Sequence, residues 1–122
     1  MNTAGYDRFY KHQFCLNHLD LRRADLANVN LSGVKLEEAD LSEAVLACAN
    51  LSGADLTKTK LVGTDLSFAN LTLAKFSSSD LENTIFFKAN LEHANLRGNK
   101  NLTQEQFETA IWDKTTQHPF QK

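Results

Sequence analysis

The stretch ADLSEAVLACANLSGADL, residues 39 to 56, places leucine at every fifth position and alanine two residues before each leucine. A straight helix turns about 100° per residue, so residues five apart would point in directions about 140° apart. In a strand, residues five apart lie on opposite faces. Neither element gathers these leucines on one side, and the stretch therefore predicts a chain that bends once every five residues.

The five-residue register extends far beyond this stretch. We call the leucine position of each pentapeptide its centre, and centres run without insertion from Leu16 to Leu96: fifteen of the seventeen are leucine, and the others are Phe76 and Phe86. The position two before the centre is mostly small, and the position one before it is Asp or Asn in eleven of seventeen pentapeptides. The two positions after the centre are mainly polar or glycine. Each pentapeptide therefore predicts two inward side chains followed by a solvent-exposed corner.

The number of sides in one coil can be inferred from the spacing of identical residues, because stacked coils should place identical residues above one another. Asparagine precedes the centre at Asn30, Asn50, Asn70 and Asn90, which are spaced by twenty residues. Stacked coils of four pentapeptides would superimpose these residues, so we expect four sides per coil. We also expect the asparagine column to form a ladder of side-chain amides between coils.

The pentapeptides ADLAN, ADLSE, ANLSG, ADLTK and ANLEH carry the motif A-[D/N]-L-x-x, and the chain resembles the pentapeptide repeat family over residues 14–98. The resemblance implies an all-β solenoid: a right-handed quadrilateral β-helix with four pentapeptides per coil and about four coils. We expect residues 1–13 to form an N-terminal cap segment, in which Tyr6, Phe9 and Tyr10 have helical spacing.

The C-terminal residues 99–122 break the period, and we expect a short capping helix and a tail there. Thr103 and Gln106 have the spacing of a capping box. Phe107, Ala110 and Ile111 would then share the face that closes the last coil.

Composition favours a soluble single domain without cofactors. The 122 residues carry a net charge of −2, and no segment has the apolar length of a signal peptide or membrane span, so we expect a cytoplasmic protein. His12, Cys15 and His18 lack the spacing of a standard zinc finger, and we expect no metal site. Cys15 and Cys48 are expected to be free thiols. No phosphate-binding loop or nucleophile elbow occurs, which argues against an enzyme and against a small-molecule substrate.

Two surface features suggest a function. The first is an acidic corner formed by Glu37, Glu38, Asp40 and Glu43. Some members of the family resemble DNA in shape and charge and bind type II topoisomerases, so the resemblance makes a DNA-mimicking topoisomerase binder the alternative function. Residues 14–98 carry eleven acidic and eight basic residues, however, and this balance is weak for a phosphate mimic. Direct binding of nucleic acid is not expected.

The second feature is an apolar group at outward positions on one side of the predicted coil: Val45, Ala47, Cys48, Phe68, Ile85 and Phe87. Contiguous apolar residues on an otherwise polar surface are typical of a protein contact. The competing interpretation is that a terminal segment folds over this side. Our leading hypothesis is a non-enzymatic scaffold for protein–protein interaction, with a protein partner or a homodimer at this surface.

Overall fold

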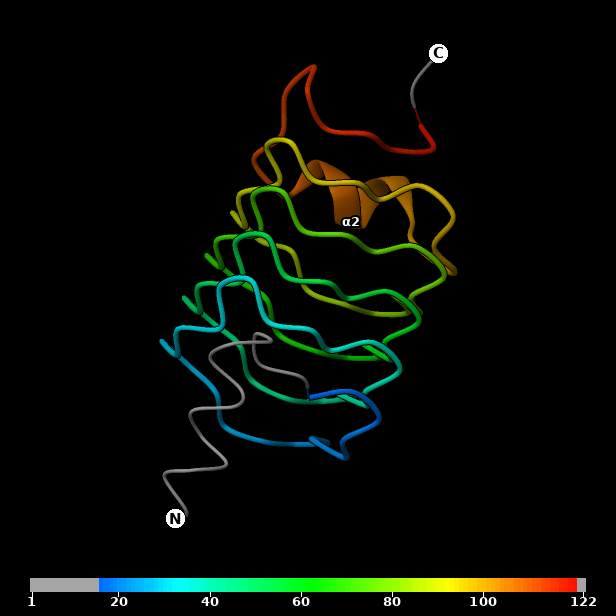
Figure 1. Cartoon of the computed structure of the whole chain (residues 1–122). Coiled ribbons are helices and arrows are strands. Elements are labelled where there is room, and N and C mark those ends of the chain that lie inside the picture. The colour runs from blue at the N-terminus through cyan, green and yellow to red at the C-terminus, as the bar shows by residue number, and fades with distance from the viewer. Residues whose placement is uncertain (1–15, 121–122) are drawn as a thin grey trace.

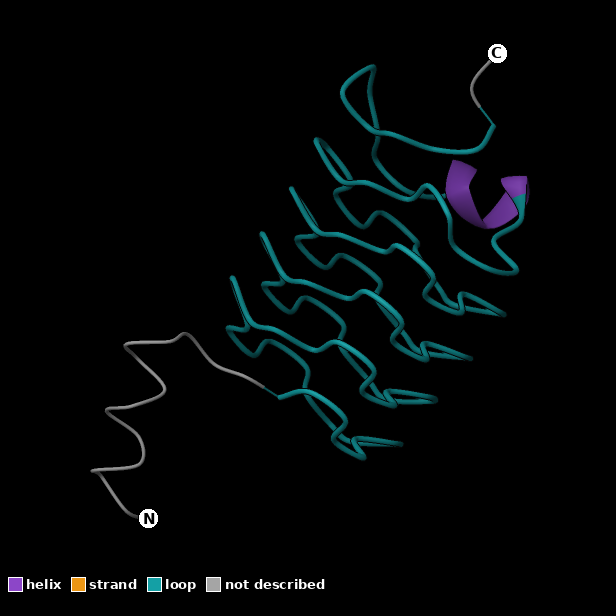
Figure 2. Ribbon diagram, turned by 45° about the vertical axis from the view of Figure 1, so that its right-hand side comes forward, coloured by secondary structure: helices purple, strands orange, loops and turns teal. Residues whose placement is uncertain are grey.

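The computed structural model describes residues 16–120, so the N-terminal cap segment expected at residues 1–13 lies outside the described residues. The described chain winds into a stack of four-sided coils (Figure 1). Within residues 20–100, parallel β-bridges join residues twenty positions apart, as in Asp20 with Asp40 and Asn50 with Asn70. These bridges confirm the twenty-residue coil. Each is isolated, and Figure 2 accordingly draws no strand arrows in this part of the chain.

The four sides of the coil are named here by their centres. The first face carries Leu16, Leu36, Leu56, Phe76 and Leu96; the second carries Leu21, Leu41, Leu61 and Leu81; the third carries Leu26, Leu46, Leu66 and Phe86; the fourth carries Leu31, Leu51, Leu71 and Leu91. The first coil comprises residues 16–35, the second 36–55, the third 56–75 and the fourth 76–95.

Each corner is a tight turn with the same backbone geometry. The N–H two residues before the next centre donates to the carbonyl of the preceding centre, as from Ala44 to Leu41 at 2.9 Å. The residue two after the centre has positive φ at every corner from residue 18 to residue 98, at thirteen non-glycine residues and four glycines. Type II turns require positive φ at this position, which glycine and asparagine adopt most easily.

The Asp or Asn before each centre stabilises the turn that follows it. Its Oδ1 accepts the N–H of the residue two positions later, at 3.0 Å from Ser42 to Asp40 and at 3.0 Å from Ser52 to Asn50. This bond explains why Asp and Asn are interchangeable in the motif. The side chains of the asparagine column therefore stabilise the turns within each coil. These bonds, and not the expected ladder of amides between coils, explain the column.

Leucines fill the interior and small residues pack between them. The centres of the second and third coils are fully buried, including Leu36 and Leu56. Where a hydroxyl residue points inward, it donates to a backbone carbonyl. Thr64 donates to Leu41 and Thr84 to Leu61 of the coil below, both at 2.7 Å. Ser79 donates to Phe76 of its own coil at 2.6 Å. These bonds remove the cost of burying a polar group.

The C-terminal end of the stack is closed by helix α2, Gln104–Glu108, and the segment after it (Figure 1). The predicted capping box is present, with Thr103 as N-cap and Gln106 at its third helical position. The Gln106 Nε2 also donates to the carbonyls of Leu81 at 2.9 Å and Thr84 at 2.8 Å. It thereby takes the place of the N–H groups that a further coil would supply.

Buried aromatic stacking completes this end. Phe107 is 1% exposed, and its ring centroid lies 4.5 Å from that of His118 and 4.8 Å from that of Trp112. The prediction that Ile111 lies on the face that closes the last coil was wrong. Ile111 is 51% exposed, because the chain resumes the path of the coil there and Ile111 forms a β-bridge with Asn90.

At the opposite end the core thins. The centres of the first coil are only partly buried within residues 16–120, namely Leu16, Leu21, Leu26 and Leu31. Burial of the centres therefore increases from the first coil to the second.

Candidate protein-contact face

The apolar residues predicted to point outward lie together on the third face and its following corner, and we call them the contact face: Val45, Ala47, Cys48, Phe68, Ile85 and Phe87. The exposed fractions are 55% for Phe68 and 47% for Phe87. Their rings meet edge to face with centroids 5.6 Å apart. Val45 and Ile85 are also exposed and lie in one column, with Asp65 between them. The apolar residues of the contact face therefore lie on one side of the second to fourth coils, with Asp65 and Ser67 between them.

Phe68 has the positive φ that is common to the corner residues. Phe68 has φ of 59°, a conformation that a bulky residue adopts at a cost and that glycine adopts freely. Gly63 performs the same role at the preceding corner of the third coil. A large aromatic in this position adds strain and exposed apolar area, which a contact would offset.

Leu73 shares this feature and was not predicted. It is 58% exposed with φ of 64°, at the corner after the fourth face. The sequence signal was available, since Leu73 occupies the same position in its pentapeptide as Phe68, two residues after the centre. The fourth face, which carries the asparagine column, separates Leu73 from the contact face.

Two opposite charges lie within the contact face. Asp65 sits between Val45 and Ile85 in the ladder, and its Oδ1 accepts the Ser67 N–H at 2.9 Å. No ion pair of Asp65 occurs among residues 16–120. The Lys88 ammonium lies 5.6 Å from the centroid of the Phe87 ring. The patch therefore combines apolar area with one carboxylate and one ammonium.

The C-terminal segment does not cover the contact face. Residues after the fourth coil stack on the end of the tube, where Lys88 N–H donates to the Thr109 carbonyl at 2.8 Å and Phe107 packs on His118. With this segment in place, Phe68 and Phe87 remain about half exposed. Of the two terminal segments weighed as covers, the C-terminal one is excluded, and residues 1–15 lie outside the described part of the chain.

The predicted acidic corner is spread over two corners and the face between them. Glu37 and Glu38 occupy the corner before the second face, Asp40 lies on that face, and Glu43 occupies the corner after it. Neighbouring bases face these carboxylates. Arg23 Nε lies 3.2 Å from a Glu43 oxygen.

The charge of Asp40 is likewise compensated by its surroundings. Burial raises its pKa, but hydrogen bonds from Ser42 and the charges of Lys60 and Arg22 outweigh burial and lower the pKa of Asp40 overall. His18 Nε2 lies 3.4 Å from a Glu38 oxygen. The acidic residues therefore belong to a mixed-charge surface and form no continuous negative stripe.

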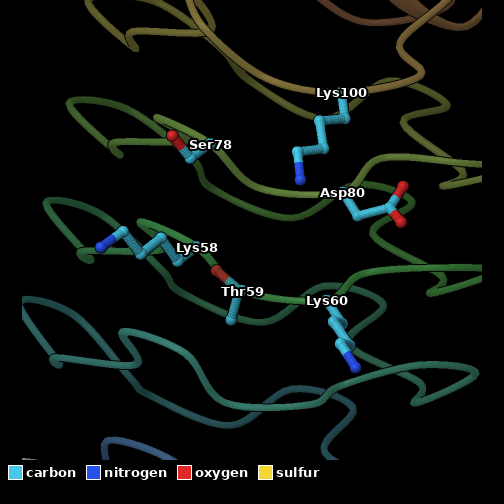
Figure 3. Close-up of a pocket in the computed structure, with 6 residues that line it drawn as sticks. All are labelled: Lys58, Thr59, Lys60, Ser78, Asp80 and Lys100. Carbon is cyan, nitrogen blue, oxygen red and sulfur yellow. The ribbon is translucent and has the colours of Figure 1, made fainter.

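A hollow of about 400 Å³ on the second face is lined by basic and hydroxyl residues: Lys58, Thr59, Lys60, Ser78, Asp80 and Lys100. The three lysine side chains do not converge on one point in Figure 3, since Lys58 and Lys60 extend in different directions. Asp80 pairs in the ladder with both Lys60 and Lys100. The lining of the hollow thus carries three lysines against one carboxylate, and the lysine side chains form no preformed anion cradle.

Metal and membrane features are absent from residues 16–120. They contain no cluster of three or more potential metal ligands, and Cys48 is an exposed free thiol. His12 and Cys15 lie outside this range. The helical structure within it includes nothing of the length and apolarity needed to cross a membrane.

Comparison with known proteins agrees with the coil geometry. Eight copies of the pentapeptide repeat model match, in overlapping segments that run from residue 13 to residue 99. The chain belongs to the pentapeptide repeat family. Members of this family are generally non-enzymatic repeat proteins. A search of curated proteins gives no match.

Solved structures of this pentapeptide repeat fold are similar to the chain. A pentapeptide repeat protein from the thylakoid lumen of Arabidopsis thaliana is 28% identical with a TM-score of 0.65, over 79% of this chain and 62% of the other. The chain thus spans less than two thirds of that protein. Rfr23 from the cyanobacterium Cyanothece 51142 has a TM-score of 0.69 at 24% identity, over 94% of this chain and 97% of the other. The fluoroquinolone resistance protein QnrB1 reaches only 0.40 at 19% identity, over 82% and 60%, too loose to indicate a shared partner.

Proposed function

We propose that the protein is a non-enzymatic interaction scaffold, a right-handed β-helix that binds a protein partner through the contact face. The observation that carries the proposal is the exposed pair Phe68 and Phe87, whose rings meet edge to face on the third face of the tube. Exposed aromatic pairs of this kind are favoured at the centres of protein interfaces.

A double variant tests the proposal. Phe68→Asp with Phe87→Asp places two charges on the contact face and leaves the inward ladders intact, so the fold should persist by circular dichroism while binding is lost. Leu73→Asp with Lys58→Asp is the matched control, because both residues are exposed positive-φ corner residues outside the contact face. Binding is read by self-association and by recovery of partners from the native host. Equal binding by the wild-type protein and both double variants would refute a role for the contact face.

The DNA-mimicking alternative has weaker support from the surface. A phosphate mimic needs a run of uncompensated carboxylates, whereas Arg23 pairs with Glu43 and Lys60 lies in the ladder next to Asp40. We therefore expect no inhibition or protection of DNA gyrase by the purified protein in a supercoiling assay. Clear inhibition that is lost on reversing Glu37 and Glu38 to lysine would favour the mimic instead.

A further inference from the structure

We propose that residues 1–15 dock on the open end of the first coil and cap it. The open end is the side of the first coil that faces away from the second coil, and it lies at the end of the stack opposite to helix α2 (Figure 1). This inference is independent of the proposed function, because it concerns a surface other than the contact face.

The open end exposes apolar side chains that belong to the core. Leu19 is 42% exposed, whereas Ala39, at the same position of the second coil, is fully buried. The four centres of the first coil are only partly buried within residues 16–120. Leu19, Val29 and Val34 also replace the alanine that most often lies two residues before the centre. These larger side chains leave more apolar area for a cap to cover.

The open end also has a row of backbone groups without partners. In the coils above, the N–H of the residue before each centre donates to the coil below, as from Asp40 to the Leu19 carbonyl at 2.9 Å. The equivalent N–H groups of Asp20, Asp25 and Asn30 have no acceptor within residues 16–120, and we call them the edge amides. The carbonyls of the same three residues accept no hydrogen bond from that part of the chain. Another stretch of backbone can satisfy such an edge, because it offers donors and acceptors together.

The N-terminal segment has the length, composition and position that this edge requires. At five residues per side, its fifteen residues are long enough to follow three sides of the coil. Four of them are aromatic, namely Tyr6, Phe9, Tyr10 and Phe14. The segment joins the first coil at Leu16 and is thus tethered beside the open end. A short tether gives an effective concentration on the order of millimolar, which favours this segment over a separate partner.

The opposite end of the tube shows how this chain caps a coil. There the five-residue period breaks, Phe107 is buried against the last coil, and Gln106 donates to carbonyls of the fourth coil. The N-terminal segment breaks the period in the same way, since Lys11 lies where a further coil would need an apolar centre. The occupant of the open end is therefore a cap of this kind and not an additional coil.

Nuclear Overhauser effects in the full chain test where the segment docks. The aromatic rings of the segment should show these effects to the methyl groups of Leu19 and Leu21. Effects to the methyl groups of Val45 and Ile85 instead would place the segment on the contact face and overturn the proposal. The absence of effects to any methyl group of the coils would overturn it as well.

A triple variant tests whether the aromatic residues hold the cap in place. With Tyr6→Ser, Phe9→Ser and Tyr10→Ser together, the edge amides should exchange with solvent at least about tenfold faster than in the wild type, because their cover opens. The amides of Leu56 and Leu61, in the third coil, should keep their exchange rates. Unchanged rates there show that the tube remains folded, so that the effect belongs to the open end.

The matched control changes three polar residues of the same segment, Arg8→Ser, Lys11→Ser and Gln13→Ser. Its edge amides should exchange as slowly as those of the wild type. Equal exchange in the wild type and both triple variants would overturn the cap, and so would equal acceleration by both variants. Protection of the edge amides that rises with protein concentration from about 20 μM to about 500 μM would assign the cover to a second copy and also overturn the proposal.

Discussion

Replacing Leu56 by alanine should test the central feature of the fold, the stacked leucine ladders. Leu56 is fully buried in the middle of the tube, between Leu36 below and Phe76 above on the first face. Backbone bonds hold these coils at fixed spacing, from Leu36 N–H to Asp55 at 2.9 Å and from Leu56 N–H to Lys75 at 2.8 Å. The neighbours therefore cannot close the cavity that the substitution creates.

The size of the effect follows from this rigidity. Buried Leu→Ala changes cost about 2 to 5 kcal/mol, with the upper part of the range at sites that do not collapse. We expect Leu56→Ala to lower the free energy of unfolding by about 4 kcal/mol, a large part of the 5–15 kcal/mol typical of a domain. The thermal midpoint should fall by roughly 15 °C or more.

Guanidinium unfolding followed by far-ultraviolet circular dichroism measures this change, with two controls. Leu16→Ala removes the same side chain from the same ladder in the first coil, where the centre is only partly buried, and should cost about half as much. Ser77→Ala, at an exposed corner position, should change stability by less than about 0.5 kcal/mol. A Leu56→Ala variant within 1 kcal/mol of Ser77→Ala would show that the inward register is wrong.

Two further predictions concern the C-terminal end. Gln106→Ala should cost about 2 kcal/mol in chemical unfolding, because the Thr84 carbonyl loses its donor, the Leu81 carbonyl keeps only the Thr84 N–H, and the Thr103 N–H loses its side-chain acceptor. Gln104→Ala, which lacks those bonds, should cost less than a quarter of that, and equal costs would refute the capping role. Burial and the charge of Arg97 lower the pKa of His118 below its ordinary 6.5, and its Nδ1 has no partner within residues 16–120. The fold thus prefers neutral His118, so stability should be full above about pH 6.5 and fall as the pH drops toward 5. His118→Phe should remove this slope in thermal melts between pH 7.5 and 5, and an unchanged slope would contradict the assignment.

The coil period and the core could be predicted from the sequence because one local rule is repeated seventeen times. Each pentapeptide specifies which side chains point inward. A departure from the motif at one centre, such as phenylalanine in place of leucine at Phe76, therefore does not shift the register. The C-terminal coil could not be predicted in the same way. Helix α2 replaces part of the third face, and the bridges to Ile111 and Gln117 consequently join residues 21 and 22 apart instead of twenty. A search for a fixed period does not find such a coil.

The contact face was predictable in composition and less so in detail. The register alone places Phe68 and Phe87 outward one coil apart, and the structure shows them exposed. Their edge-to-face contact and the position of Lys88 over the Phe87 ring depend on side-chain rotamers, which a periodic pattern does not specify. The same applies to the pairing of Arg23 with Glu43, which lowers the net charge of the predicted acidic corner.

The hydrogen bonding of the coil determines what kind of partner a side of the tube can bind. On the third face, the Leu46 N–H donates to the Asp65 carbonyl at 2.8 Å and the Leu66 N–H donates to the Ile85 carbonyl at 2.8 Å, so the backbone of the third coil is paired with the coils below and above. A partner cannot add a strand to this face, because strand addition needs a free edge. Recognition must therefore rest on the outward side chains, which the fold constrains only through turn geometry. Substitutions such as Phe68→Asp can then change binding while the inward ladders, and with them the fold, remain as they are.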